Sequence, residues 1–172
     1  MHAWNDPARQ EMVALLPRLR RFACSLTGSN DGGDDLVQST CERALSRLHL
    51  WEPGTRLDRW MFRILRNLWF DDLRAGRRCE VATSNEILDK FAGGDSEAEL
   101  VARLELGAVR ELIGRLPAEQ RAVLMLVSVE GLSYREAATA LDVPIGTVMS
   151  RLARARLALG RALEPSRPEA VP

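Results

Sequence analysis

Apolar residues recur at spacings of three and four along most of the chain, which is the period of amphipathic α-helices. Alanine, leucine and arginine dominate the composition, and these residues favour helices. The sequence therefore predicts an all-α protein. The expected helices cover residues 7–27, about 33–48, about 56–78, about 96–115, 117 to about 130, and two short stretches within 133–163.

The last two helices are predicted to meet at a tight turn. Gly131 is expected to end the preceding helix, and Ser133 with Glu136 has the spacing of a capping box that starts the next one at Tyr134. Pro144 prevents that helix from continuing past Leu141 and can open the final helix. The first helix is expected to pack through Ala137, Ala138 and Leu141, and the second through Val148, Leu152, Ala155, Leu159 and Leu163.

The final helix carries arginines without a single acid. Residues 143–163 include four arginines and neither Asp nor Glu, whereas a solvated helix face usually mixes both signs. Two short helices, a tight corner and a polar, basic second helix describe a helix-turn-helix reader of the DNA major groove. The alternative is an ordinary helical hairpin with a solvated basic face. The polar and basic positions are Thr147, Ser150, Arg151, Arg154 and Arg161.

A second basic segment, residues 56–78, interleaves arginines with aromatic side chains. Guanidinium groups can hold phosphate while rings stack on unpaired bases, so this helix suits single-stranded nucleic acid. A core stripe with a solvated basic face is again the alternative. The expected stripe is Leu57, Trp60, Met61, Ile64, Leu65, Leu68 and Leu73, with Arg59, Arg63, Arg66, Asn67, Trp69, Phe70, Arg74, Arg77 and Arg78 largely outside it.

Proline, glycine and acidic residues punctuate the N-terminal helices. Pro17 is expected to kink or split the first helix, Gly28 to end it, and residues 29–33 to form a loop. Asp34 and Asp35 begin the second helix, where acids favour the positive end of the helix dipole. From the residues alone, capping explains these acids better than a binding face does. The buried side of this helix is expected to be Leu36, Val37, Cys41, Ala44, Leu45 and Leu48.

Residues 79–95 lose the helical period, end near two glycines and lie among many acids. This composition predicts a flexible linker that divides the chain into two small helical modules, 7–78 and 96–163. Since DNA would repel the acidic stretch, it is expected to space the modules or to meet a protein.

Composition excludes several classes of function. The 172 residues carry 24 basic and 24 acidic side chains, so any DNA contact must come from local patches. Cys24, Cys41 and Cys79 are widely spaced, which argues against a disulfide framework or a zinc site. No Ser/His/Asp or Cys/His set and no glycine-rich phosphate loop is evident, so no enzyme activity, metal or cofactor is expected. The absence of a signal peptide and of a membrane-length apolar run predicts a cytoplasmic protein without membrane insertion.

Two stretches resemble the extracytoplasmic-function (ECF) sigma factors of bacterial RNA polymerase. Residues 34–45 (DDLVQSTCERAL) and 62–78 (FRILRNLWFDDLRAGRR) resemble sigma region 2, including Asn67 followed one turn later by Asp71. Residues 116–156 resemble region 4, and their GTVMSRLARAR is close to the family's GTV-x-SRL-x-RAR. The order and spacing of the two stretches in one chain make the resemblance specific.

The resemblance implies a promoter-specificity subunit. Region 2 (7–78) would bind the β′ coiled coil of core polymerase and open the minus-10 element, and region 4 (96–163) would read minus-35 duplex beside the β flap. The family also implies a stress-response regulon and an anti-sigma factor as inhibitor. The implied polymerase contacts are Asp35, Leu36, Gln38 and Arg43; the minus-10 contacts are Trp51, Arg59, Arg63, Asn67, Arg74, Arg77 and Arg78; the minus-35 contacts are Thr147, Met149, Ser150, Arg151 and Arg154.

Departures from the family pattern affect single contacts. Ser39 stands where Glu is frequent, and Met149 stands where Lys or Arg is common, which replaces one cation of the reader with an apolar side chain. Two other functions remain open. One is a free-standing helix-turn-helix regulator that binds DNA without polymerase, and the other is a partner-switching protein that mimics a sigma factor and binds its inhibitor. The arginine-rich helix 56–78 argues against a mimic, which has no need to hold DNA.

Overall fold

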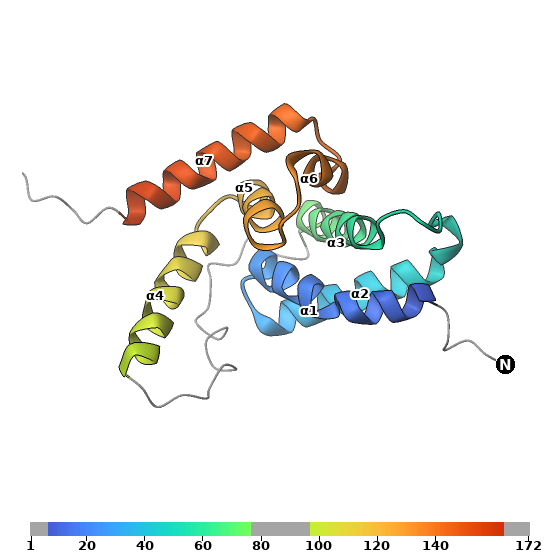
Figure 1. Cartoon of the computed structure of the whole chain (residues 1–172), viewed down its shortest axis with the longest axis horizontal. Coiled ribbons are helices and arrows are strands. Elements are labelled where there is room, and N and C mark those ends of the chain that lie inside the picture. The colour runs from blue at the N-terminus through green and yellow to red at the C-terminus, as the bar shows by residue number, and fades with distance from the viewer. Residues whose placement is uncertain (1–6, 77–96, 164–172) are drawn as a thin grey trace, which may run out of the picture.

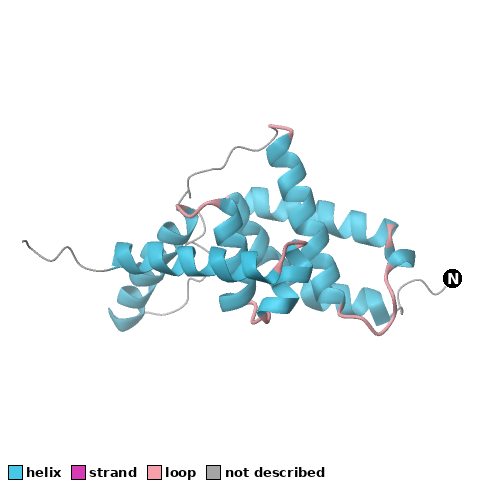
Figure 2. Ribbon diagram, turned by 90° about the horizontal axis from the view of Figure 1, so that it is seen from above, coloured by secondary structure: helices cyan, strands magenta, loops and turns pink. Residues whose placement is uncertain are grey.

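The computed structural model describes residues 7–76 and 97–163, with side chains described for 7–76 and 106–163. Within these ranges the secondary structure is helical, without a strand, as the sequence predicted (Figures 1 and 2). The predictions for Arg77, Arg78, Cys79 and the linker 79–95 fall outside the described residues. The elements are α1 (Pro7–Thr27), α2 (Asn30–Ser46), a 3-10 turn (Leu48–Leu50), α3 (Leu57–Arg74), α4 (Glu97–Gly114), α5 (Ala118–Leu124), a π-helical turn η3 (Met125–Val129), α6 (Tyr134–Leu141) and α7 (Ile145–Leu163).

The first module packs α1, α2 and α3 around one aromatic-rich core. The rings of Phe22 and Phe62 meet edge to face with their centroids 5.4 Å apart, an arrangement that aromatic pairs favour. Trp69 is fully buried, so the prediction that it lies outside the core stripe was wrong. Because α3 packs against α1, α2 and α6, its buried face is wider than a single stripe. Phe70 is half-buried against the same core.

Helix α2 begins earlier than predicted, because Asn30–Gly33 form its first turn rather than a loop. Ser29 is the N-cap, and its hydroxyl oxygen accepts a hydrogen bond from the Gly32 N–H at 3.1 Å. Gly33 lies against α1 so closely that a Cβ there would be 2.9 Å from the backbone nitrogen of Cys24. Gly32 and Gly33 therefore allow the start of α2 to pack closely on α1, although in the sequence they are typical of a loop. Leu45 is 48% exposed, so the prediction that it is buried was wrong.

Pro17 lies inside α1, which continues unbroken from Pro7 to Thr27, so the expected split does not occur. Proline removes one backbone hydrogen bond from a helix. Packing of the buried face, which includes Leu15, Leu19 and Phe22, outweighs that cost, while Pro17 itself is exposed. A proline on the solvent side of a well-packed helix is therefore compatible with a single element.

The second module packs α5 and α6 against α7, and η3 continues from α5 and contacts α6. Arg121 is 2% exposed, and its Nη1 donates to the carbonyl oxygen of Gly114 at 2.7 Å, so a buried cation satisfies the C-terminal end of α4. The face of α7 that includes Val148, Leu152 and Ala155 is buried, as predicted. Leu163 is 54% exposed, which contradicts the predicted stripe, because the last turns of α7 extend beyond α5 (Figure 1).

The two modules pack directly on each other. Helix α6 lies against α3, and α5 lies against α1 (Figure 1). Buried side chains of both modules join into one continuous apolar cluster. Within the described ranges, no helix combines the length and apolar character that a membrane crossing requires.

Candidate nucleic-acid and polymerase interfaces

The α6–α7 hairpin has the local geometry of a helix-turn-helix. The Ser133 hydroxyl accepts from the Glu136 N–H at 3.3 Å, and the Glu136 carboxylate accepts from the Ser133 N–H at 2.7 Å, which completes the predicted capping box. Asp142 then takes a left-handed conformation with φ 50°, which ends α6. The carbonyl oxygen of Pro144 accepts the N–H groups of Thr147 and Val148, so α7 starts immediately after the turn.

Of the five predicted minus-35 residues on α7, Met149 and Arg154 are exposed and the other three are half-buried. Met149 is 53% exposed, and Arg154 is exposed and makes no ion pair with a described residue. Thr147 and Ser150 are half-buried, and the Ser150 hydroxyl donates to the Thr147 carbonyl oxygen at 3.1 Å. Arg151 differs, because its guanidinium lies 2.5 Å from the carboxylate of Glu119 in α5. Arg154 is therefore the more readily available cation of the reader.

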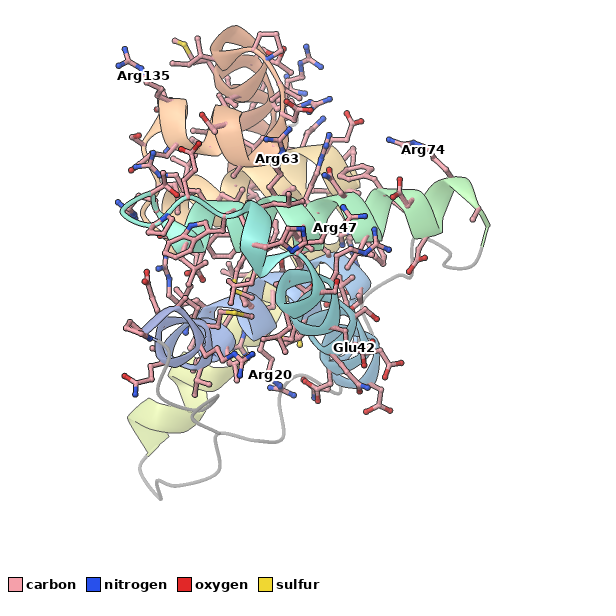
Figure 3. The ribbon with its side chains drawn as sticks, turned by 90° about the vertical axis from the view of Figure 1, so that its right-hand side faces the viewer. Arg20, Glu42, Arg47, Arg63, Arg74 and Arg135 are labelled. Carbon is pink, nitrogen blue, oxygen red and sulfur yellow. The ribbon has the colours of Figure 1, made fainter. Side chains whose placement is uncertain are left out.

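The predicted minus-10 cations of α3 point in two directions. Arg59 is bonded to Glu136, and Arg63 lies 3.7 Å from Asp142, so both face the α6–α7 hairpin. Arg74 pairs within α3 to Asp71 at 2.8 Å and extends into solvent (Figure 3). Arg59 and Arg63 thus contact the second module, whereas Arg74 remains exposed.

Asn67 belongs to a small exposed platform on α3. Its amide oxygen accepts from the guanidinium of Arg66 at 2.9 Å, and that guanidinium lies 4.9 Å from the centre of the Phe70 ring. Burial lowers the pKa of Arg66 from its usual value, and the group stays a cation at neutral pH. The platform thus combines an exposed amide with a half-buried cation that is stacked on a half-buried ring. Trp51 lies in the neighbouring loop and is half-buried against the core.

Three of the predicted polymerase contacts lie on the exposed side of α2. Asp35, Gln38 and Arg43 are exposed, and the Gln38 amide donates to Glu42 at 3.1 Å. Figure 3 shows Glu42 on the outer surface of the first module. Leu36 is fully buried, so its side chain supports the core and does not reach a partner.

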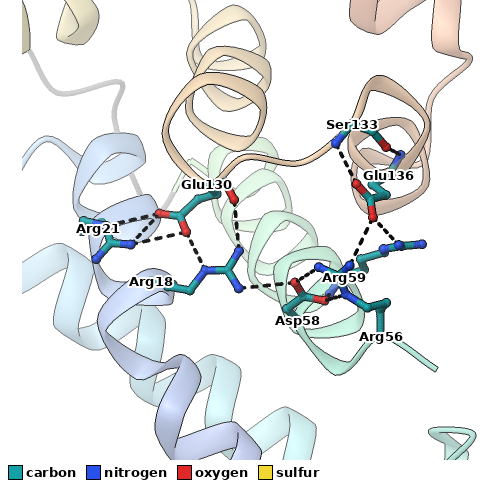
Figure 4. Close-up of polar contacts among 8 residues, drawn as sticks. All are labelled: Arg18, Arg21, Arg56, Asp58, Arg59, Glu130, Ser133 and Glu136. Carbon is teal, nitrogen blue, oxygen red and sulfur yellow. Dashed lines mark hydrogen bonds and ion pairs between the residues drawn. The ribbon is translucent and has the colours of Figure 1, made fainter. Parts of the chain in front are cut away.

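Sequence reasoning missed a set of ion pairs that join the modules (Figure 4). Glu130, which follows η3, has a side chain only 1% exposed and lies 2.8 Å from Arg18 and 3.2 Å from Arg21 of α1. Arg18 also lies 3.3 Å from Asp58 of α3. No local signal identifies a pair such as Arg18 and Glu130, which are 112 positions apart.

The charge of Asp58 is fixed by its arginine neighbours. Burial by itself would raise the pKa of this carboxyl group, but the hydrogen bond and charge of Arg56, the Arg59 backbone N–H and the charge of Arg18 together hold it below its ordinary value. The pKa of Glu136 is also lowered, first by the backbone and hydroxyl of Ser133 and then by the charges of Arg59 and Arg56. Both groups are carboxylates at neutral pH.

Each module matches a known domain family. Residues 12–66 match the sigma-2 domain of PhyR, and residues 106–159 match sigma-70 region 4. Over 159 residues the chain is 40% identical to the ECF RNA polymerase sigma factor EcfG of Rhodopseudomonas palustris, an alignment that covers 92% of this chain and 86% of the relative.

Solved structures share the arrangement of helices. The sigma factor RpoE from Bartonella quintana, in its complex with the anti-sigma factor NepR, has a TM-score of 0.72 and 33% identity, with 92% of this chain and 98% of that chain covered. The anti-anti-sigma factor PhyR of the same organism has a TM-score of 0.59 and 19% identity, with 90% of this chain and 50% of that chain covered. The second likeness shows the fold alone.

The two domain matches place a sigma-2 domain before a sigma-70 region 4 in one short chain. With 40% identity over nearly its whole length, the chain belongs to the family of ECF RNA polymerase sigma factors. The predicted family and fold class are confirmed.

Proposed function

We propose that this sigma factor recruits core RNA polymerase through the exposed side of α2, reads the minus-35 element as duplex through α7 and captures minus-10 bases through α3. Region 2 would comprise residues 7–78, the linker 79–95, and region 4 residues 96–163. The observation that carries the proposal is that one chain holds two different surfaces suited to nucleic acid. One is an exposed helix face without acids, and the other is the amide, cation and ring platform around Asn67.

The platform around Asn67 suits opened strands rather than duplex. Flipping a base out of the stack costs a few kcal/mol, and stacking on an aromatic side chain returns about 1–3 kcal/mol per base. Phe70 and Asn67 can offer a stacking surface and hydrogen bonds, while Arg74 can hold phosphate. Trp51, which is half-buried against the core, would hold the loop before α3 in place. The opening energy would be shared with polymerase binding, because the chain alone offers few such contacts.

The exposed polar side of α2 supports the polymerase contact. Asp35, Gln38 and Arg43 form a mixed-charge surface that is not used in packing. The β′ coiled coil would bind here, with Leu36 holding α2 in place from beneath, and the β flap would bind region 4. The protein acts as a binding subunit without catalysis of its own, in the cytoplasm where polymerase works.

Control by an anti-sigma factor is part of the proposal. The similar RpoE of Bartonella quintana is bound to the anti-sigma factor NepR in its structure. An inhibitor of the same kind would hold this chain away from polymerase until a stress signal releases it. The matched PhyR domain keeps the mimic as a second candidate, because a PhyR shares the fold. The exposed, acid-free face of α7 favours a DNA-binding sigma factor.

In vitro transcription tests the proposal directly. The full chain, purified core polymerase and genomic fragments of the native host should give transcripts with defined start sites, while the chain alone binds the same fragments weakly. Tight duplex binding without core enzyme, and no specific transcript, would instead support a free-standing regulator. Binding of an inhibitor with neither DNA binding nor transcription would support a mimic.

A further inference from the structure

Acids of the second module pair with three arginines at the start of α3, and two of these, Arg59 and Arg63, are predicted minus-10 contacts. Arg59 and Arg63 are four residues apart, so they lie on one side of the helix, and Arg56 is the residue that caps its N-terminal end. Glu136 bonds Arg59 and lies 3.3 Å from Arg56 (Figure 4). Asp142, at the end of α6, lies 3.7 Å from Arg63. Carboxylates of the same chain are thus in the positions that DNA phosphates would need.

A second contact holds the other side of the same interface. The Glu130 carboxylate accepts from Arg18 Nε at 2.8 Å and from Arg21, and Arg18 also donates to the Glu130 carbonyl oxygen at 3.3 Å. The side chain of Glu130 is almost completely enclosed between the modules. A buried carboxylate is tolerated only when it is paired and hydrogen-bonded, and both modules are needed to enclose this one.

A chain closed in this way cannot span a promoter. The ion pair between Arg63 and Asp142 places the start of α7 next to α3. The minus-35 and minus-10 elements are about 25 base pairs apart by their names, which is ~85 Å of straight duplex at ~3.4 Å per base pair. Helix α7, with 19 residues, is only ~28 Å long. The proposed surfaces on α3 and α7 therefore must separate before both elements can be bound.

We propose that this closed arrangement is an autoinhibitory clasp, in which Glu130, Glu136 and Asp142 of the second module hold Arg18, Arg21, Arg56, Arg59 and Arg63 of the first. The clasp rests on the proposed function of α3 and α7. Promoter DNA and the acids of α6 compete for the same arginines, so the chain alone binds DNA poorly. Core polymerase, by binding the two modules at separate places, opens the clasp and frees α3.

The clasp is built to open. The pairs of Arg56 with Glu136 and of Arg63 with Asp142 are partly exposed, and such pairs are individually weak and screened by salt. The continuous apolar cluster and the enclosed Glu130 favour closure. If DNA binds only the open form, its apparent affinity is the affinity of that form multiplied by the fraction of chains that are open. A change in the open fraction therefore changes the apparent DNA affinity in proportion.

The test removes two clasp charges without disturbing local structure. The variant Glu136→Gln/Asp142→Asn keeps the capping box, which Gln also completes, and keeps the left-handed residue, which Asn tolerates. The matched control Asp31→Asn/Glu111→Gln changes the net charge equally at two exposed residues that form none of the described ion pairs between the modules. Full-length chains are compared by small-angle X-ray scattering across a salt series and by binding to a fluorescein-labelled thymidine oligonucleotide.

The clasp predicts a larger radius of gyration and several-fold tighter oligonucleotide binding for the Glu136→Gln/Asp142→Asn variant, with the control matching the parent. A Glu130→Gln variant should also expand the chain. If oligonucleotide binding tightened equally in the Glu136→Gln/Asp142→Asn variant and in its control, net charge would explain the effect and the clasp would be wrong. An unchanged radius of gyration in both this variant and Glu130→Gln would also overturn it. Transcription by the parent chain with core polymerase is measured in parallel. If only the clasp is wrong, the parent still gives specific transcripts; if the proposed function is wrong, it gives none.

Discussion

The guanidinium of Arg18 in α1 lies 2.8 Å from the carboxylate of Glu130, 112 positions further along the chain. This pair joins the first module to the residue that follows η3, just before the α6–α7 hairpin of the second module. Arg18 also lies over the Phe62 ring, 5.5 Å from its centroid, and reaches Asp58 of α3. One arginine of α1 thus contacts both α3 and the residue that follows η3.

Replacing Glu130 by Ala should lower the free energy of unfolding by ~1–2 kcal/mol, because Arg18 and Arg21 lose an enclosed partner. The loss stays below that of a fully buried pair, since the side chains of both arginines retain access to water. Urea unfolding measures it. Glu111→Ala removes an exposed pair within α4 and should cost under ~0.5 kcal/mol. Equal losses for the two variants would show that Glu130 contributes no more than a surface charge.

Trp69 and Asn67 are near neighbours on α3, and we expect their substitutions to have different effects. Trp69→Leu leaves a void in a fully buried site and should lower the free energy of unfolding by ~2–4 kcal/mol. The temperature at which near-ultraviolet circular dichroism is lost measures this. A thermal midpoint equal to that of the parent would place Trp69 outside the core.

Asn67→Ala should leave stability unchanged, because Asn67 is exposed and its amide oxygen accepts only one hydrogen bond from Arg66 among the described contacts. It should impair promoter opening with core polymerase while duplex minus-35 binding stays intact. Permanganate reactivity of minus-10 thymines reports opening. Opening equal to that of the parent would remove Asn67 from the proposed minus-10 surface.

The sequence predicted best the features whose signals are local. The capping box of Ser133 and Glu136 and the turn ending at Pro144 are specified by adjacent residues, so α6 was placed correctly. Asn30–Gly33 read as a loop because the reason for Gly33 is a close approach to Cys24, which only the packing of α1 on α2 reveals. The burial of Trp69 and the contact of Arg18 with Glu130 likewise depend on which helices become neighbours. Periodicity along one helix carries no information about that choice.

Acid should weaken the first module through Asp58. The pKa of its carboxyl group is lower in the folded chain than its ordinary value of 3.8, so between the two values the unfolded chain binds more protons. The stabilisation is therefore fully present above about pH 5 and is lost as the pH falls through the folded pKa. Thermal midpoints measured from about pH 5 down to about pH 2 should fall, and Asp58→Asn should flatten that slope. Asp31→Asn, at an exposed position, should keep the parent's slope.

Arg154 is the reader cation that makes no ion pair with a described residue, whereas Arg151 must first leave Glu119. Arg154→Ala should therefore weaken minus-35 binding by ~1–3 kcal/mol if the guanidinium contacts a base edge. Arg161→Ala, near the exposed end of α7, serves as the charge-matched control.

Binding of the polymerase holoenzyme to the parent promoter and to promoters with single minus-35 substitutions separates two possible roles of Arg154. A loss confined to one base position makes Arg154 a base reader, whereas an equal loss on every sequence, with a shallower salt dependence, makes it a phosphate clamp. Unchanged binding on all of these promoters would remove Arg154 from the interface.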